Sequence, residues 1–380
     1  MDFALSKTHV LQQELFRRFA ENEIKPLARD MDEDETYSKE LLSKMQACGF
    51  FGIPFPKEYG GAGADYLTYA LCMEEVSKQD ASTGITISVH TSLCCGSIFE
   101  FGNEEHKQTW LRPLIDGSKI SCFGLTEPNA GSDASEQQTR AVLNDGHYVI
   151  NGSKVFTTNS GFADTFLVFA VTNKEMKTRG ISAFIVPKET PGLTVSPNIP
   201  RMGLRAASNC VVTYENVRVP AGNLLGKEGE GFKIAMKALD GGRIGIAAQS
   251  VGIAQGALNE AIKYVKERKQ FGRTIASFQN TQFKIAEMQT KIDAARMLTY
   301  RAASLKDQHQ PFPTEAAMCK LFASEVANEV TRGCVQLLGG YGYSREYPVE
   351  RMMRDAKITE IYEGTSEIMK MIIAGNMKIR

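Results

Sequence analysis

The sequence lacks an excess of charge of either sign. Lysine and arginine total 44 residues, aspartate and glutamate also total 44, and the sequence pI is near 7. A chain that binds nucleic acid or an anionic membrane surface usually carries a clear positive excess. We therefore expect neither nucleic acid nor a membrane to be its main partner.

Clustered metal ligands and paired cysteines are lacking too. None of the five histidines lies four residues from another, and the eight cysteines show no C-x-x-C spacing. This dispersion predicts neither a metal site nor a small disulfide framework. Reduced thiols in a cytoplasm are the simplest interpretation.

Long apolar runs and targeting signals are also scarce. Thr83–Phe101 is the most apolar stretch, but Ser88, His90 and Glu100 interrupt it, which favours a buried helix over a membrane span. The first residues show no basic segment followed by an apolar one. These features predict a cytoplasmic protein.

What is present is a three-part pattern that predicts an α+β multi-domain fold. Helical periodicity dominates the first part, and a capping residue such as Ser38 or Asn103 precedes some of its helices. We predict an N-terminal helical domain at residues 1–118, with helices over 6–29, 39–48, 65–79, 82–101 and 104–115.

The pattern then changes to short runs rich in Val, Ile, Phe and Thr, separated by turn signals. They predict a middle antiparallel β-barrel or sheet domain at residues 119–226, with strands over 120–125, 147–158, 166–171, 181–186, 193–195 and 210–214. Long helices over 232–267, 279–307 and 314–338 predict a C-terminal four-helix bundle domain at 227–380. No strand–GxGxxG–helix unit or Walker A sequence occurs, so a cofactor must be held in another way.

One acidic residue near the C-terminus invites two interpretations. Glu363 follows the apolar pair Ile361 and Tyr362, and Thr365 or Ser366 can cap the helix that follows. A carboxylate among apolar neighbours has a raised pKa and can serve as a base. An acidic residue at the start of a helix can also simply complement the helix dipole. These residues alone leave both interpretations open.

Four stretches, in order, carry a resemblance to a known family. They are Phe123–Asp133 (FGLTEPNAGSD), Arg268–Gly272 (RKQFG), Gln336–Tyr343 (QLLGGYGY) and Tyr362–Thr365 (YEGT). With the three-part order, they make essentially the whole chain resemble the acyl-CoA dehydrogenases, most of all the bacterial short-chain (butyryl-CoA) type.

The resemblance implies a flavoenzyme that oxidises a short-chain acyl-CoA to the trans-2-enoyl-CoA and passes electrons to an electron-transferring flavoprotein. Glu363 matches the family's catalytic base, which takes the α proton while the N5 atom of FAD accepts the β hydride. A flavin suits this reaction because no side chain can accept hydride. Some relatives place the base immediately before the bundle arginine, where this chain has Gly242 before Arg243; that alternative base is absent here.

The resemblance also implies the cofactor contacts. The strand-exit loop and a later strand meet the flavin ring and pyrophosphate through Phe123, Leu125, Thr126, Gly131, Ser132, Phe156, Thr157 and Thr158. A second group reaches the adenine and pyrophosphate of an FAD bound mainly by a neighbouring subunit: Arg268, Phe271, Gln279, Gln336 and Gly340. Thr365 and Glu367 complete the set. Without the resemblance, Arg268 reads as an ordinary surface arginine.

Substrate contacts are implied at Ser132, Asp240, Arg243, Tyr362 and Gly364, although Asp240 and Arg243 also fit a surface ion pair three residues apart. The family further implies a homotetramer, built as a dimer of dimers. An acyl-CoA oxidase or an enoyl-CoA reductase would use the same residues. A non-catalytic helical binding protein would keep the bundle but would not need Glu363 and the flavin loop together.

Overall fold

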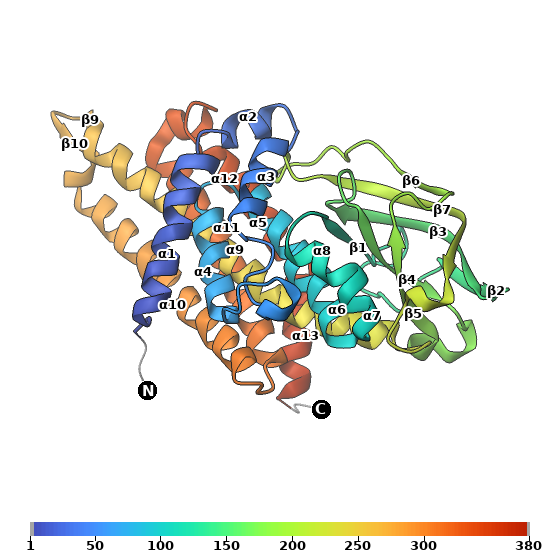
Figure 1. Cartoon of the computed structure of the whole chain (residues 1–380). Helices are drawn as coiled ribbons and strands as arrows, with labels where there is room; N and C mark the ends of the chain where they lie inside the picture. The colour runs from blue at the N-terminus through green and yellow to red at the C-terminus, as the bar shows by residue number, and fades with distance from the viewer. Residues whose placement is uncertain (1–3, 378–380) are drawn as a thin grey trace.

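The computed structural model describes residues 4–377; residues 1–3 and 378–380, the outer ends of the predicted first and last domains, lie outside the described part. Helices from both ends of the chain pack into one body, and a β-sheet region lies at one side of it (Figure 1). This arrangement confirms the predicted succession of helices, sheet and helices. Within residues 4–377, every helix falls short of the length or the hydrophobicity that a bilayer crossing requires.

The N-terminal region is helical, but its helices are broken more often than predicted. The expected single helix over 82–101 is α5, a π-helical segment and α6, and the helix over 6–29 is also interrupted. Apolar periodicity cannot distinguish a π turn from an α turn when every side is buried. The elements are α1 (Lys7–Phe19), η1 (Ala20–Ile24), α2 (Ala28–Glu33), α3 (Lys39–Ala47), η2 (Lys57–Tyr59), α4 (Tyr66–Ser77), α5 (Ala81–Ser88), η3 (Val89–Cys95), α6 (Gly96–Phe101), α7 (Glu104–His106), η4 (Lys107–Leu111) and α8 (Arg112–Ile115).

The middle region is an eight-stranded, largely antiparallel sheet. Seven strands follow the order β6-β7-β3-β2-β4-β5-β8, and β1 lies outside this order and pairs with β4. Its strands are β1 (Ser121–Gly124), β2 (Arg140–Asn144), β3 (His147–Thr158), β4 (Thr165–Val171), β5 (Ile181–Pro187), β6 (Leu193–Val195), β7 (Asn209–Pro220) and β8 (Leu224–Leu225). The antiparallel prediction is wrong for two pairings: β1 with β4, and the single residue pair that joins β2 to β4, are both parallel. The prediction also missed β2, whose outer face is exposed, and ended β7 six residues early.

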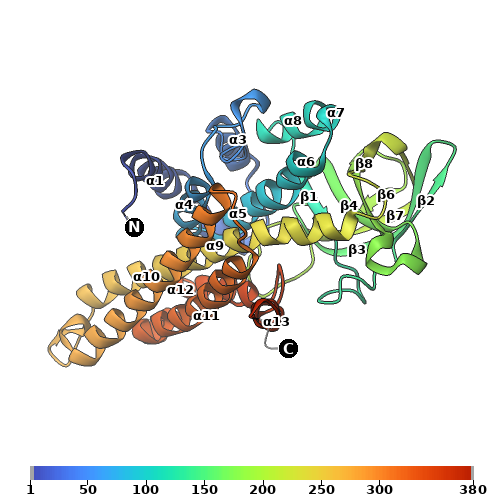
Figure 2. The ribbon, with the colours of Figure 1, turned by 90° about the horizontal axis from the view of Figure 1, so that it is seen from below.

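The C-terminal region is the predicted bundle of long helices. Figure 2 shows α9 running from beside the sheet to the opposite end of the molecule, where a small hairpin turns the chain back. The elements are α9 (Gly231–Glu267), β9 (Lys269–Gln270), β10 (Arg273–Thr274), η7 (Ile275–Ser277), α10 (Gln279–Asp307), α11 (Pro313–Leu338), η8 (Gly339–Tyr343), α12 (Val349–Lys357), η9 (Ile358–Glu360) and α13 (Ser366–Asn376).

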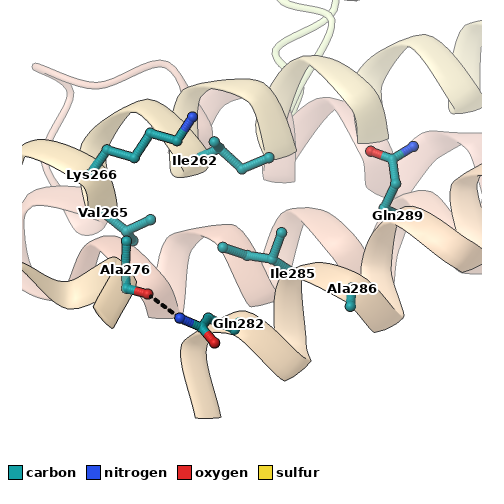
Figure 3. A pocket seen from close by; sticks show the side chains of 8 residues that line it. All are labelled: Ile262, Val265, Lys266, Ala276, Gln282, Ile285, Ala286 and Gln289. Carbon is teal, nitrogen blue, oxygen red and sulfur yellow. Dashed lines mark hydrogen bonds between the residues drawn. The ribbon is translucent and has the colours of Figure 1, made fainter. Parts of the chain in front are cut away.

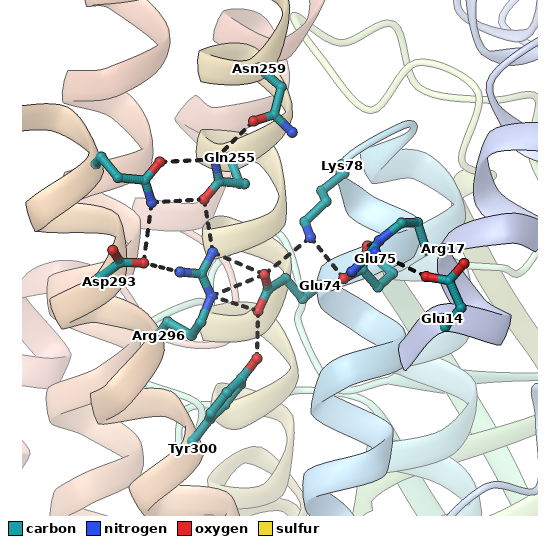
Figure 4. Close-up of polar contacts among 11 residues, drawn as sticks. Glu14, Arg17, Glu74, Glu75, Lys78, Gln255, Asn259, Asp293, Arg296 and Tyr300 are labelled. Atoms are coloured by element: carbon teal, nitrogen blue, oxygen red, sulfur yellow. Dashed lines mark hydrogen bonds and ion pairs between the residues drawn. The ribbon is translucent and has the colours of Figure 1, made fainter. Parts of the chain in front are cut away.

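Helix α9 packs very closely against α4 of the first region. A Cβ atom at Gly252 would lie 2.4 Å from the carbonyl oxygen of Glu74, so only glycine permits this approach. Beside the contact, the buried Glu74 carboxylate receives hydrogen bonds from Arg296 and Tyr300 of α10, and Lys78 forms an ion pair with it (Figure 4). Because a buried carboxylate needs such partners, this network joins the two helical regions.

Candidate active site

Glu363 lies in a left-handed turn between η9 and α13. Its φ is 52° and that of Gly364 is 102°, values that glycine adopts readily and glutamate rarely. Thr365 caps α13 by accepting a hydrogen bond from the N–H of Ile368, which decides between the two predicted caps. The turn and its cap therefore fix the backbone on both sides of Glu363.

The Glu363 carboxylate is buried and faces α9. Neither of its oxygens is exposed, and neither has a hydrogen-bond partner among the described residues. A Cβ atom at Gly242 would lie 2.1 Å from Oε2 and 2.9 Å from a methyl carbon of Leu93. The absent side chain of Gly242 thus makes the space that the Glu363 carboxylate occupies.

Burial raises the pKa of Glu363 to about 7, while the positive charges of Arg243 and Lys320 oppose the rise. This result supports the base interpretation of Glu363, because a side chain that only complemented a helix dipole would keep an ordinary pKa in water. A carboxyl group with a pKa near 7 is half ionised at neutral pH and suits proton abstraction.

The residues around Glu363 form a polar shell. Arg243 is buried, donates through Nη1 to Asp240 at 2.6 Å, and points Nε at the carbonyl of Glu363 at 3.4 Å. The predicted ion pair exists, but it is not a surface pair, since the Arg243 side chain is only 5% exposed. Tyr362 donates to the side-chain oxygen of Gln249. Four of the five predicted substrate residues, Asp240, Arg243, Tyr362 and Gly364, therefore meet in one place.

The predicted flavin loop is hydrogen-bonded to the sheet. The N–H of Val155 donates to the carbonyl of Thr126, which joins the loop after β1 to the end of β3. Asn159 donates to the carbonyls of Thr86 and Ser121, and Thr86 and Leu93 belong to the continuous segment of α5 and η3. This helical segment thus contacts β1 and the residue that follows β3, and its Leu93 lies beside Gly242.

Other predicted flavin residues differ in their surroundings. Phe156 has a positive φ of 54° at a bulge between β3 and β7 and is 60% exposed, whereas Thr157 is buried. Gly131 and Ser132 lie in the exposed part of the loop. Glu367 is exposed in the first turn of α13.

Lys154 was missed by sequence reasoning, although it supports the flavin loop. Its side chain is fully buried, and Nζ donates to the carbonyl of Leu125 and to side-chain oxygens of Glu127 and Gln137 at 3.1, 2.7 and 2.8 Å. Glu127 also accepts hydrogen bonds from the N–H groups of Gln138 and Thr139. A lysine in a strand gives no sign of such a role in the sequence, because its partners are distant.

A second group of predicted residues gathers far from Glu363. Arg268, Gln336 and Gly340 line a hollow of about 580 Å³, and the guanidinium carbon of Arg268 lies 5.6 Å from the ring centre of Tyr341. Phe271 is 94% exposed at the tip of the β9–β10 hairpin, and Gln279 begins α10. Arg268 follows Arg243 by 25 residues along α9, roughly 37 Å at the α-helical rise.

Another hollow contains none of the predicted site residues. A space of about 330 Å³ lies between α9 and α10, and Figure 3 shows the side chains that line it. They are largely apolar, with Lys266 as the single titratable group. Among residues 4–377, no group of three or more His, Cys, Asp or Glu side chains is placed to hold a metal ion.

Fold and site together define a largely helical protein with a middle β-sheet region and a buried carboxylate of raised pKa on a turn beside helix α9. Family models match all three parts: the acyl-CoA dehydrogenase N-terminal domain over residues 6–118, the middle domain over 122–217 and the C-terminal domain over 229–378.

Individual relatives match over almost their full lengths. The short-chain specific acyl-CoA dehydrogenase of Clostridium acetobutylicum is 54% identical over 99% of this chain and 100% of its own. The structure of butyryl-CoA dehydrogenase from Megasphaera elsdenii superposes with a TM-score of 0.98 at 47% identity, with full coverage of both chains. A chain from the structural study of the electron transferring flavoprotein of Acidaminococcus fermentans superposes at 0.99 and 50% identity, also with full coverage of both. The chain belongs to the acyl-CoA dehydrogenase family.

Lys154→Met tests whether the buried lysine holds the flavin loop. The substitution leaves Glu127 buried without its cation, so the free energy of unfolding should fall by about 3 to 5 kcal/mol, and proteases should cut residues 125–139 faster. Urea unfolding and limited proteolysis measure both effects. Lys188→Met, which removes an exposed lysine of the same region, is the control. Equal urea midpoints for the two variants would contradict this role.

Proposed function

We propose that this protein is an FAD-dependent acyl-CoA dehydrogenase that converts a short-chain acyl-CoA to the trans-2-enoyl-CoA. The observation that carries the proposal is the buried carboxylate of Glu363, which has no hydrogen-bond partner among residues 4–377, has a pKa near 7 and lies in the space left by Gly242. An unpartnered buried carboxylate is costly for the fold, so its retention points to catalysis.

The residues present fit a bound FAD. Thr157 Oγ1 and Ser366 Oγ are buried and lack hydrogen-bond partners among the described residues, as expected of groups whose partner is a ligand. Phe123, Leu125, Thr126, Gly131, Ser132, Phe156 and Thr158 would hold the flavin part, with Thr365 and Glu367 beside it. The flavin, when bound, accepts the β hydrogen of the substrate as hydride.

Glu363 performs the acid–base part of the reaction. Its carboxylate takes the α proton of the acyl group, and the negative charge that develops moves toward the thioester oxygen. The backbone N–H of Glu363 is the proposed donor to that oxygen, acting as part of an oxyanion hole. The positive φ of Gly364 allows the backbone to turn closely around the thioester. Arg243 holds the Glu363 carbonyl and so keeps this peptide oriented.

Short acyl chains are the proposed substrates because the relatives named above act on them by description: "short-chain specific" in one case and butyryl-CoA in the other. Asp240, Arg243, Tyr362 and Gly364 surround the proposed reacting end. Ser132 is proposed to contact the CoA arm. The cytoplasm is the proposed location, supported by eight cysteines that are all free thiols.

An electron-transferring flavoprotein is the proposed electron acceptor. Support comes from the similar chain in the Acidaminococcus fermentans study, because the subject of that study is an electron transferring flavoprotein. We further propose a homotetramer in which each FAD contacts two subunits. The flavin loop and the Arg268 hollow lie toward opposite ends of α9 (Figure 2), too far apart for one FAD to reach both within one chain. Arg268, Phe271, Gln279, Gln336 and Gly340 would therefore serve the FAD of a neighbour.

Glu363→Gln tests the base directly. The variant should purify yellow and bind butyryl-CoA, but anaerobic bleaching of the flavin should slow by at least ~10³-fold, since the amide cannot take the α proton. Stopped-flow absorbance measures the rate. Glu325→Gln, which alters an exposed carboxylate paired with Lys370, should bleach at the wild-type rate. Rapid bleaching of Glu363→Gln would refute the base, and a colourless wild-type protein that binds no flavin would refute the function.

The pH dependence follows from the raised pKa of Glu363. The ionised form is the active base, so the bleaching rate should rise about tenfold per pH unit below pH 7 and level off above it. Because the folded pKa exceeds the unfolded one, the folded chain binds this proton more tightly, and Glu363 lowers stability as the pH rises from about 4.5 through 7. Bleaching rates measured across this pH range test the predicted rise. A bleaching rate independent of pH would contradict it.

Subunit sharing of FAD can be tested by mixing two inactive chains. In a mixed dimer of Glu363→Gln and Arg268→Met chains, one site combines an intact Glu363 with its neighbour's intact Arg268. Co-expression should therefore restore roughly a quarter of the wild-type active sites if chains pair at random. Each variant expressed alone is the control. Activity no higher than that of the single variants would mean that each FAD belongs to one chain.

A further inference from the structure

Lys320 lies buried on α11 without a carboxylate partner within ion-pair distance among residues 4–377. Its exposed fraction is 0%, and its neighbours on the buried face of the helix are small, including Ala316, Ala317 and Ala323. Burial lowers the pKa of Lys320 to about 8. A buried lysine is costly unless it is paired and fully hydrogen-bonded, so its retention needs an explanation.

The lysine holds the turn that carries the base. Its Nζ donates to the carbonyl of Gly364 at 2.6 Å, while Arg243 points Nε at the preceding carbonyl, that of Glu363, at 3.4 Å. Two cations from two different helices therefore hold successive carbonyls of one left-handed turn. A turn that has positive φ at both residues needs such outside support, because glutamate adopts this conformation at a cost.

The same charge acts on the carboxylate. Lys320 and Arg243 are the two cations whose fields favour the ionised form of Glu363, against the effect of burial. Other titratable or charged groups face this cluster from the surrounding elements: Tyr66 and Tyr69 from α4, Asp240 from α9, Cys319 from α11, and Glu360, Tyr362 and Glu367 from the segment of Glu363 itself.

We propose that Lys320 is a positioning residue for Glu363: it fixes the Gly364 carbonyl and holds its ammonium group beside the turn that carries the carboxylate. This inference rests on the proposed function of Glu363 as the α-proton base. Lys320 itself touches neither substrate nor flavin in this proposal and acts only through the turn and its charge.

The test compares three variants of the flavin-loaded protein. Lys320→Met removes the charge and the donor, Lys320→Arg keeps both, and Lys370→Met removes an exposed cation of α13 that forms an ion pair with Glu325. Anaerobic bleaching by butyryl-CoA is followed by stopped flow over a pH range centred on 7. If Lys320→Met does not fold, Lys320→Gln replaces it, since it keeps a donor without the charge.

The proposal predicts that the acid limb of the bleaching rate moves upward by roughly one pH unit in Lys320→Met, since a nearby opposite charge lowers a carboxyl pKa by about 1 to 3 units. Lys320→Arg should restore most of the shift, and Lys370→Met should show none. A rate that falls equally at every pH in Lys320→Met, with an unmoved limb, would overturn the proposal in favour of a merely structural lysine.

A second readout separates this inference from the proposed function. The ionisation of Glu363 is followed by ¹³C NMR of the glutamate side-chain carboxyl carbon, with Glu363→Gln as the assignment control. The midpoint should rise in Lys320→Met even if the wild-type protein were not bleached by butyryl-CoA. An unchanged midpoint would overturn the role of Lys320 and would leave the bleaching assay of the wild type to decide the function.

Discussion

The structure depends on one electrostatic compromise, the burial of the Glu363 carboxylate in the space left by Gly242. Burial disfavours the charge, while Arg243 and Lys320 favour it, and the balance gives a pKa near 7. Either influence alone would spoil the base: full burial without cations would keep it protonated, and cations without burial would make it a weak base. Other features of the site serve this balance.

Helix α9 contributes Gly242 and Arg243 to this site and extends well beyond them. Its glycines allow several close approaches, among them that of Glu363 at Gly242 and that of α4 at Gly252. Its far end presents Arg268 to a separate hollow. A helix of 37 residues gains most of its stability from packing rather than from propensity, so the glycines are tolerated where contact is closest. One element thus links the proposed chemistry of one subunit to the proposed cofactor contact of the next.

Much of this could be predicted from the sequence, because long amphipathic helices and short strands have strong local signals. The bounds of α10 were predicted to the residue, and the caps at Ser38 and Asn103 follow from residue type. The π-helical segment η3 could not be predicted, since its side chains are buried on all sides. The parallel pairing of β1 with β4 is a tertiary property that no local pattern encodes.

The candidate site, like the fold, could be predicted from the sequence only in part. Glu363 and Arg268 stand in recognisable stretches, and the structure buries the carboxylate oxygens of Glu363. The roles of Lys154 and Lys320 could not be predicted, because each is an ordinary lysine whose partners are distant in the sequence. Lys154 meets Glu127 27 residues away, and Lys320 meets Gly364 44 residues away. Their burial is what makes them important, and burial of a lysine contradicts its usual preference.

The most direct test of this account is the ionisation of Glu363 in the unmodified protein. A ¹³C NMR titration of its carboxyl carbon measures the pKa without relying on turnover. The account predicts a midpoint near 7, well above the ordinary value of a glutamate. A midpoint near 4.5 would mean that solvent reaches the carboxylate, and it would contradict the claim that burial beside Gly242 creates the base.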